Sequence, residues 1–481
     1  MRIGAHMKKD TVTIPPTGFV HTSGTEIVDG AGRRLLLRGV GLGNWLLAEG
    51  YMWRFGDELA SPRQIEARIE GLVGAERAAE FWRTFRARYV TEADIALIAE
   101  SGFDHVRLPI NARGVMDDDG VFLEDGFAHI DDAIDWCERH GLWILLDLHG
   151  APGGQTGTNI DDSPNGVPEL FMDERYRALT VRLWTEIARR YRSRTAVLGY
   201  DLLNEPLPNE WHDRYADDLV TLYAELTSAV RAVDPDHLIM YEGTRWATDW
   251  SIFDRVEDGN AVLQFHRYWC PPDRSSIVEY LDARDRLGVP IYMGEGGENT
   301  PEWIYSATRL YERHGIGWNF WPWKKLETRT SPLSVSAPEG WSRITDPADA
   351  LEPEAAWTIL LDMLDRIRVE RCEWRAPVVD ALFGRLPLDL PAWGGGADGP
   401  AWSDIPEGMW HHTAGEPYAT DEHVSVHLPT GARLEFPLAS EPSSWVVRSS
   451  DDGAVDVAWV DDRLVATARR AVTVTGMRVE V

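Results

Sequence analysis

Lysine is almost absent from this chain of 481 residues. Four of its 48 basic side chains are lysines, and the other 44 are arginines. The lysines lie in two adjacent pairs, Lys8 with Lys9 and Lys324 with Lys325. Chemistry that forms a Schiff base needs a desolvated lysine on a buried strand, so this composition nearly excludes it.

Cysteine, long apolar runs and metal-binding motifs are also rare or missing. The three cysteines are far apart in the chain, so free thiols in a reducing compartment are the default expectation. No run of 18 apolar residues occurs and no apolar signal segment is seen, so we expect no membrane insertion. The expected location is the cytoplasm, or outside the cell if a signal segment has been removed. His-x-His and His-Glu-x-x-His are absent, so we expect no metal and no other cofactor.

Acidic residues outnumber basic ones, 78 to 48, and the formal net charge is −30. Such a charge argues against nucleic acid and anionic membrane surfaces as partners, whereas a neutral partner tolerates it. Hydrophobic residues make up 44% of the chain, which supports a packed core and argues against disorder.

Eight short apolar runs with β-branched residues alternate with longer helical patterns. Runs of this kind are typical of parallel strands that are buried on both faces. Eight strand-and-helix units in series predict an α/β fold, a (β/α)8 TIM barrel over residues 20–375, whose active site lies at the C-terminal ends of the strands. The predicted strands are 34–41, 105–110, 143–149, 197–204, 237–242, 261–266, 290–294 and 317–321.

Further elements are predicted on either side of these units. The turn at 26–33 predicts a hairpin that covers the floor of the barrel. An amphipathic pattern over 354–369 predicts the last barrel helix. After Arg375 the pattern changes to a glycine-rich stretch and short alternating runs, which predict a C-terminal β-sandwich domain over 385–481. We expect this domain to dock on the barrel away from the active site.

Two glutamates end predicted strands of the barrel. Glu205 follows the fourth strand, directly after Asn204, and Glu295 follows the seventh. Because the C-terminal ends of barrel strands meet at one mouth, both carboxylates are predicted to face one cleft. Two facing carboxylates are what cleavage of a glycosidic bond requires, and a separation of roughly 5 Å is expected for a retaining mechanism.

Other polar and aromatic residues end the same strands. Each has a plainer interpretation when taken alone: Arg107 could be a structural ion-pair residue, and His149 a core histidine. Their coincidence at the ends of several strands favours a functional site. The set is Arg107, Asn111, His149, Asn204, His266, Tyr268 and Trp321.

Together these motifs resemble glycoside hydrolase family 5, which belongs to a clan of retaining barrel glycosidases. The resemblance implies that Glu205 is the general acid/base and Glu295 the nucleophile. It also implies that Asn204 binds the sugar 2-hydroxyl and that Arg107 and Tyr268 keep the nucleophile ionised, as a charged group needs cationic and hydrogen-bonding neighbours.

The resemblance covers roughly residues 20–370 and extends to further positions. His266 would line the acid/base side, and Trp321 would form a platform for the sugar. Two departures from the family pattern stand out. Glycines follow Glu295 where many members carry an aromatic residue, and Glu298 offers a rival nucleophile.

Two segments, 39–49 and 147–157, look like those of exo-β-1,3-glucanases in the same family, which remove single glucose units from chain ends. Long insertions after the first and third strands would wall off a pocket for such a unit. We therefore expect exo-type action on β-glucosides or short β-glucans through a covalent glycosyl-enzyme. The candidates for binding the enclosed sugar are Asn44, Glu49, His149 and Asn204.

Other interpretations remain open for the same residues. Among enzymes, the chain could be a β-mannosidase, a β-galactosidase, a glycolipid-cleaving family member or a metal-dependent barrel hydrolase. In a different class, it could be a barrel that binds carbohydrate without catalysis. The C-terminal domain could also bind carbohydrate, although a stabilising role is the simpler hypothesis because fold alone does not establish function. The expected partner in every case is a carbohydrate or glycoside.

Overall fold

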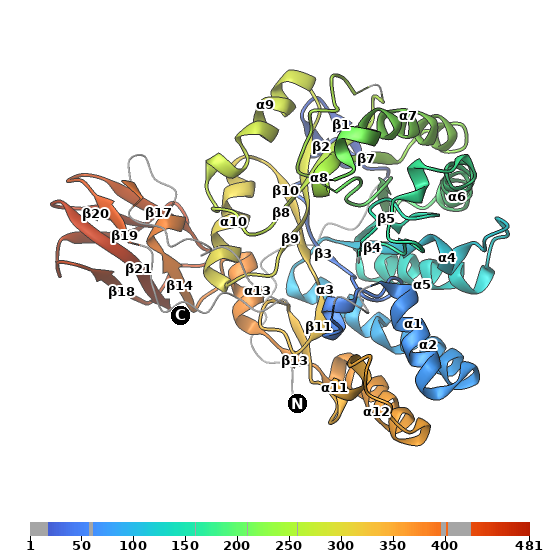
Figure 1. Cartoon of the computed structure of the whole chain (residues 1–481). Helices are drawn as coiled ribbons and strands as arrows, with labels where there is room; N and C mark the ends of the chain where they lie inside the picture. Colours follow the sequence, from blue (N-terminus) through green and yellow to red (C-terminus); the bar gives the residue numbers. More distant parts are fainter. Residues whose placement is uncertain are drawn as a thin grey trace.

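A closed barrel of eight parallel strands forms the centre of the protein (Figure 1). The computed structural model describes residues 18–56, 61–158, 160–208, 210–256, 258–395, 401–402 and 425–481. Strands pair around the barrel in the order β10-β3-β4-β5-β6-β7-β8-β9, which confirms the predicted α/β class and (β/α)8 barrel. Their bounds are β3 Arg38–Gly41, β4 His105–Asn111, β5 Trp143–Gly150, β6 Val197–Asp201, β7 Leu238–Glu242, β8 Ala261–Arg267, β9 Ile291–Gly297 and β10 Gly317–Trp321.

The strand ends differ from those expected in a way that matters for the site. β6 ends at Asp201, three residues earlier than predicted, so Asn204 and Glu205 lie in the turn beyond the strand. Leu202 and Leu203 continue the apolar run because they are fully buried, although they lie outside the strand. An apolar run signals burial, and burial continues here beyond the sheet. In contrast, β9 extends to Gly297 and carries Glu295 within the strand.

Helices cover the outer face of the barrel between successive strands. A capping box starts α3: the Asp94 carboxylate accepts hydrogen bonds from the Thr91 amide (3.0 Å) and hydroxyl (2.9 Å). Within the described ranges, no helix combines the length and apolar character needed to cross a membrane. The covering helices are α3 Glu92–Ser101, α5 Glu124–His140, α6 Glu174–Tyr191, α7 His212–Arg231, α9 Val278–Leu287 and α10 Pro301–Arg313, with the short helices α4 Ala112–Val115 and α8 Thr244–Ala247 and the 3-10 turns η3 Glu169–Phe171 and η4 Arg274–Ser276 in the connections.

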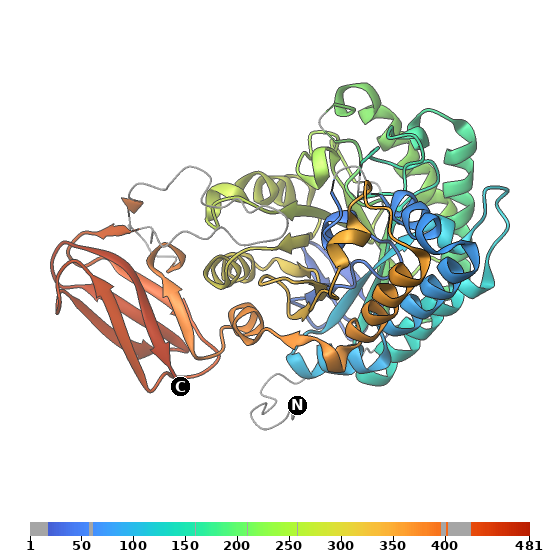
Figure 2. The same cartoon turned by 60° about the horizontal axis from the view of Figure 1, so that its bottom comes forward.

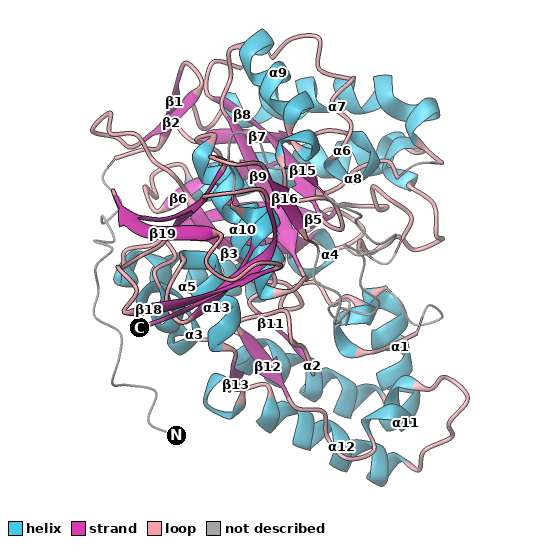
Figure 3. Ribbon diagram, turned by 90° about the vertical axis from the view of Figure 1, so that its left-hand side faces the viewer, coloured by secondary structure: helices cyan, strands magenta, loops and turns pink. Residues whose placement is uncertain are grey.

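The helix predicted to close the barrel packs elsewhere. It is α12 (Pro353–Arg366), and it packs on α1 (Pro62–Val73) and α2 (Ala75–Tyr89) of the insertion after β3 (Figure 3). A later helix, α13 (Ala376–Phe383), packs on α10 and brings Phe383 against Trp318 of β10, with ring centroids 6.0 Å apart. The prediction was wrong because two apolar-faced helices follow β10, and their patterns do not say which one meets the barrel. Smaller elements in this region are η1 Gly50–Trp53, α11 Trp341–Thr345, η5 Val369–Arg371 and a sheet of β11 Lys324–Leu326, β12 Leu333–Val335 and β13 Glu373–Trp374.

An N-terminal hairpin covers the floor of the barrel, as expected, but its turn lies at 24–25. The predicted segment 26–33 instead supplies the second strand and a following turn that an antiparallel bridge between Val28 and Arg34 closes. The hairpin consists of β1 (His21–Ser23) and β2 (Glu26–Val28). Val20 and Ile27 are buried in an apolar cluster with side chains from the N-terminal halves of the barrel strands. The remaining members of this cluster, which we call the floor cluster, are Leu37, Trp143, Leu145, Leu198, Leu238, Met240, Val262 and Tyr292.

A C-terminal domain of antiparallel sheets lies to one side of the barrel, next to α10 (Figure 1, Figure 2). The Tyr305 hydroxyl of α10 donates a hydrogen bond to the carbonyl of Pro437 (2.9 Å). This domain confirms the expected β-sandwich-like fold, whereas the exact domain limits, 20–375 and 385–481, stay a prediction. One sheet contains β14 Leu388–Pro391, β15 Ala401–Trp402, β16 Val426–Leu428, β18 Ser444–Ser449 and β21 Val472–Glu480, and the other contains β17 Arg433–Pro437, β19 Val455–Val460 and β20 Arg463–Ala468, with the turn η6 Ala392–Gly394 after β14.

Candidate active site

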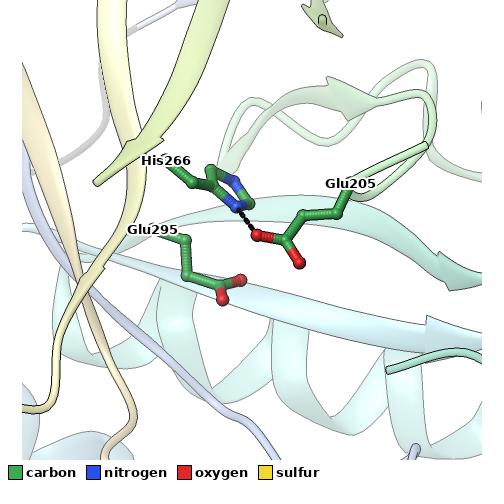
Figure 4. Close-up of side chains that lie close together, drawn as sticks. All are labelled: Glu205, His266 and Glu295. Carbon is green, nitrogen blue, oxygen red and sulfur yellow. Dashed lines mark hydrogen bonds and ion pairs between the residues drawn. The ribbon is translucent and has the colours of Figure 1, made fainter. Parts of the chain in front are cut away.

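Glu205 and Glu295 face each other at the C-terminal mouth of the barrel (Figure 4). One carboxylate oxygen from each and a ring nitrogen of His266 all lie within 4.8 Å of one another. Retaining glycosidases hold their two carboxyl groups about 5 Å apart, whereas inverting ones leave roughly 6.5–9.5 Å for a water molecule. The separation therefore agrees with the predicted retaining geometry.

Local backbone geometry aims Glu205 at its partner. Its φ of 44° lies in the left-handed region, which is uncommon for a residue other than glycine. Its amide donates a hydrogen bond of 2.6 Å to Glu242 at the end of β7, so the neighbouring strand holds the strained turn in place. Strain of this kind persists only where surrounding contacts over-determine it, and it is frequent at functional sites.

Glu295 receives two strong hydrogen bonds. Arg107 on β4 donates to one of its oxygens (2.7 Å), and the hydroxyl of Tyr268, just after β8, donates to the other (2.9 Å). Burial nevertheless raises the pKa of Glu295 above its ordinary value, and the charge of Glu205 adds to this, while His266 and Arg107 oppose it. The expected pairing is present, and it limits a pKa increase that burial would otherwise make larger.

Arg107 is fully buried and contacts several acidic groups at once. Besides Glu295, its guanidinium donates to Asp201 (2.9 Å) and Glu242 (3.2 Å) and lies 3.2 Å from Asp147. Burial disfavours the guanidinium charge, but the surrounding carboxylates outweigh it and hold the pKa of Arg107 well above its ordinary value. Arg107 therefore organises a buried charge cluster beneath the two glutamates.

The carboxyl groups in this cluster differ in the direction of their pKa shifts. Burial raises the pKa of Asp147 to about 8 and raises that of Asp201 well above its ordinary value, although Arg107 lowers both. Burial would also raise the pKa of Glu242, but His266 and Arg107 outweigh it and keep that pKa below its ordinary value. Asp147 and Asp201 each have one oxygen without a hydrogen-bond partner in the described structure.

His266 connects the candidate acid/base to this cluster. Its Nδ1 lies 2.7 Å from Glu205, and its Nε2 lies 3.3 Å from Glu242 (Figure 4). Burial lowers the pKa of His266, but the charges of Glu242 and Glu295 and the bond to Glu205 outweigh it and hold the pKa well above its usual value. Glu205, His266 and Glu295 are near enough to share a cation. The carboxylates around His266 favour its protonated form, which is not a metal ligand, and Arg107 already supplies positive charge at Glu295.

His149 and Asn204 form the adjoining wall. His149 Nδ1 lies 2.7 Å from Asp147, and the Asn204 amide nitrogen lies 3.4 Å from His149 Nε2. Burial lowers the pKa of His149 to about 4, so its ring is neutral at neutral pH. The Asn204 side-chain oxygen accepts a 2.8 Å hydrogen bond from Arg107, which orients its amide nitrogen toward His149 and leaves the second amide hydrogen for the site.

Asn44 and Glu49 close the same side of the site. The Asn44 side-chain oxygen accepts hydrogen bonds from the Glu49 amide (3.2 Å) and from the indole of Trp53. One carboxylate oxygen of Glu49 is buried without a hydrogen-bond partner in the described chain and lies 3.9 Å from His149 Nε2. Burial, together with Glu295 and Glu298, raises the pKa of Glu49 well above its ordinary value.

Trp321 ends β10 and is only 1% exposed. Its ring stacks on His149 with an interplanar angle of 7° and a centroid distance of 5.5 Å. Gly41 has no side chain because a Cβ atom there would lie 2.4 Å from the indole. The ring is therefore fixed beside the site, and a sugar stacked on it would have to enter a space that is nearly closed.

A family model for cellulases, described as glycosyl hydrolase family 5, matches residues 70–327 of the chain. The chain belongs to glycosyl hydrolase family 5. It is therefore a glycoside hydrolase of the retaining barrel clan and a β-glycosidase, as the sequence motifs indicated.

Two relatives of this family 5 member are named for different activities. One, from Phanerodontia chrysosporium, is called a β-xylosidase and is 34% identical over 347 residues, which cover 64% of this chain and 71% of the relative. Another, from Emericella nidulans, is called a probable glucan 1,3-β-glucosidase A and is 31% identical over 304 residues, covering 58% of this chain and 71% of the relative. A crystal structure of an endogalactoceramidase shares the fold, with a TM-score of 0.53, 17% identity, and coverage of 96% of this chain and all of the other.

The structure brings together every residue that the sequence proposed for the family 5 site. Asn111 is the exception among the strand-end residues, because its side chain accepts from the Arg113 amide and caps α4. The supporting carboxyl groups and one lysine were not among the residues that the sequence motifs indicated. Asp147, Asp201 and Glu242 stand within or at the ends of apolar strands, and a buried carboxylate in such a run is the signal that would have found them. Lys325, whose ammonium bonds Glu298, belongs to the rare lysines noted above.

Proposed function

We propose that the protein is an exo-acting, retaining β-glycosidase that removes single sugar units from β-glucosides or short β-glucans. Glu295 acts as the nucleophile and Glu205 as the general acid/base. The observation that carries the exo assignment is the enclosure of the site: Glu205 is 8% exposed and Glu295 only 6%. A glycan that ran past both sides of the pair would need a groove, with both carboxylates open to solvent.

In the first step, an oxygen of Glu295 attacks the anomeric carbon of the sugar. The bond from that carbon to the glycosidic oxygen breaks, its electron pair goes to the departing oxygen, and Glu205 donates a proton to that oxygen. Arg107 and Tyr268 hold the attacking carboxylate in place through the two hydrogen bonds described above. Positioning of this kind supplies part of the rate enhancement.

In the second step, water attacks the anomeric carbon of the glycosyl-enzyme and loses a proton to Glu205. The bond between the sugar and Glu295 breaks, and its electron pair returns to the carboxylate. The amide of Asn204, held by Arg107 through the side-chain oxygen, is placed to donate a hydrogen bond to the sugar 2-hydroxyl. Such a bond strengthens in the transition state, so Asn204 would act on turnover more than on binding.

Two product measurements test this proposal. Digestion of a long β-glucan should release mainly monosaccharide from the start, whereas a rapid fall in viscosity with mixed oligomers would show endo cleavage. An NMR time course should show the β-anomer as the first product, because two displacements at one carbon retain its configuration.

A variant separates the two glutamate roles. Glu205→Gln should slow substrates with poor leaving groups far more than activated aryl glycosides, because the latter need little proton donation. If both substrate classes slow equally, Glu205 is not the general acid. The exposed Glu210→Gln serves as a matched control, as the same change lies five residues further along the chain.

The relative called a β-xylosidase supports a second candidate substrate, a β-xyloside. A xyloside is a glucoside without its hydroxymethyl group, so both fit the same carboxylate chemistry. Comparing kcat/KM for aryl β-glucosides, xylosides, mannosides and galactosides decides between them, since discrimination is measured by that ratio.

A further inference from the structure

A chain of polar contacts runs along one wall of the site and takes no part in the mechanism above. The Lys325 ammonium donates to one oxygen of Glu298, and the Tyr51 hydroxyl lies 3.3 Å from the other. The same hydroxyl accepts a 2.9 Å hydrogen bond from the indole nitrogen of Trp321. The chain therefore links β11, the end of β9, η1 and β10 next to the candidate nucleophile.

Burying the ion pair of Lys325 and Glu298 costs free energy. Both side chains are nearly fully buried, and removing two charges from water is repaid only in part by their attraction. Glu298 also has a φ of 48°, in the left-handed region. The arrangement thus combines a desolvated ion pair with a strained backbone, three residues after Glu295, and such features gather at functional sites more than at structural ones.

The charge of Glu298 acts on other groups of the site. After burial, which is the largest cause, it is among the causes that raise the pKa values of Tyr51, Tyr268 and Glu49. Tyr268 touches Glu295, and Glu49 lies on the opposite wall beside His149. The Tyr51 hydroxyl that contacts Glu298 also contacts Trp321, so Glu298 lies in the wall that these groups form beside the candidate nucleophile.

One oxygen of Glu298 can accept a further hydrogen bond. Lys325 engages the first oxygen closely, whereas the contact of the second with Tyr51 is long for an O–H···O bond, which is usually 2.7–2.8 Å. A carboxylate accepts hydrogen bonds only, and a sugar hydroxyl is a donor that can replace a weakly bound tyrosine.

We propose that Glu298, positioned by Lys325, accepts a hydrogen bond from one hydroxyl of the sugar whose anomeric carbon Glu295 attacks, and so helps to select that sugar. This inference rests on the proposed function. It assigns Glu298 to substrate binding instead of nucleophilic attack, and it makes Lys325 a positioning residue.

The test is a set of double-mutant cycles between the enzyme and its substrate. Values of kcat/KM are measured for wild type and Glu298→Gln with a parent aryl β-glycoside and its 2-, 3-, 4- and 6-deoxy analogues. Loss of a charged hydrogen bond should lower kcat/KM for the parent roughly 10- to 100-fold. For the one analogue that lacks the contacted hydroxyl, the same substitution should cost less than about threefold, because the contact is already absent.

Glu302→Gln is the matched control, since it lies four residues along and outside the site, and it should affect all substrates alike. Lys325→Arg keeps a positive charge but changes its position. Its kcat/KM should therefore fall mainly for substrates that retain the hydroxyl contacted by Glu298. Equal losses for Glu298→Gln with the parent and every analogue would overturn the inference while the proposed function stands. Failure of the wild-type protein to cleave any parent glycoside would instead overturn the proposed function, and the inference with it.

Discussion

The two ends of the barrel are equally buried but chemically opposite. At the floor, apolar side chains such as Val20, Leu145 and Val262 fill the space between the strands. Toward the mouth, the same strands carry Arg107, Glu295 and other charged groups that are also buried. Apolar burial stabilises a fold, whereas burial of charge usually costs free energy unless each charge is paired.

This contrast separates stability from function within one set of strands. The floor cluster depends on volume and shape, so it is sensitive to cavities. The mouth depends on the balance between carboxyl groups and the cations Arg107 and His266, and burial there raises the pKa values of Asp147 and Asp201. Substitutions at the mouth should therefore lower turnover with little change in the free energy of unfolding. Substitutions at the floor should lower the free energy of unfolding with little change in turnover.

The largest effect is expected for Glu295→Gln at the mouth. Loss of the nucleophile should lower kcat by on the order of 10⁴-fold or more, as removal of a catalytic nucleophile does elsewhere. The free energy of unfolding should change little, because the variant removes one charge from a site that is rich in carboxylates. Glu298→Gln provides the comparison: if it were the inactive variant and Glu295→Gln stayed active, the nucleophile assignment would be wrong.

Leu145→Ala at the floor should show the reverse pattern. The side chain is fully buried, so the cavity should lower the free energy of unfolding by about 2–5 kcal/mol, measured by denaturant titration. We expect kcat/KM to stay within about twofold of wild type wherever the variant is folded. A large change in kcat at temperatures well below unfolding would show that floor and mouth are coupled.

Asp147→Asn should change how stability depends on pH. The folded protein keeps this proton up to about pH 8, whereas the unfolded chain loses it near its ordinary pKa of 3.8. The contribution of Asp147 to stability is thus fully present below 3.8 and is lost as the pH rises through about 8. The variant cannot ionise, so its unfolding free energy should fall less steeply in this range, by up to about 1.4 kcal/mol per pH unit. Identical slopes for variant and wild type would contradict the raised pKa.

The smallest effect concerns the acid side of the pH profile. Because burial and Glu205 raise the pKa of Glu295, the nucleophile becomes protonated at a higher pH than an ordinary glutamate. The acid limb of kcat/KM should therefore lie above pH 4.5, and activity should fall as the pH decreases through it. The floor variant Leu145→Val should have the same limb, and an unperturbed limb in wild type would refute the shift.

Sequence patterns predicted much of this architecture because they report burial. The strand at Gly317–Trp321 was predicted to the residue, and Glu205 and Glu295 were identified from their places after apolar runs. The same patterns assigned the closing barrel helix to α12 instead of α13, since an apolar face shows that a helix packs but not on what. They also missed Glu242 and Lys325, whose partners Glu205 and Glu298 lie in other segments of the chain and meet them only in the folded protein.

The sequence by itself therefore determined the barrel, its family and its two central carboxylates, because local periodicity and strand-end residues are properties of short segments. The tertiary structure decided the rest. Which groups share the charge of Arg107, which carboxyl groups keep their protons, and how tightly the site is enclosed all depend on distances between strands far apart in the chain. Electrostatic energies vary with those distances and with burial, and no short segment contains either quantity.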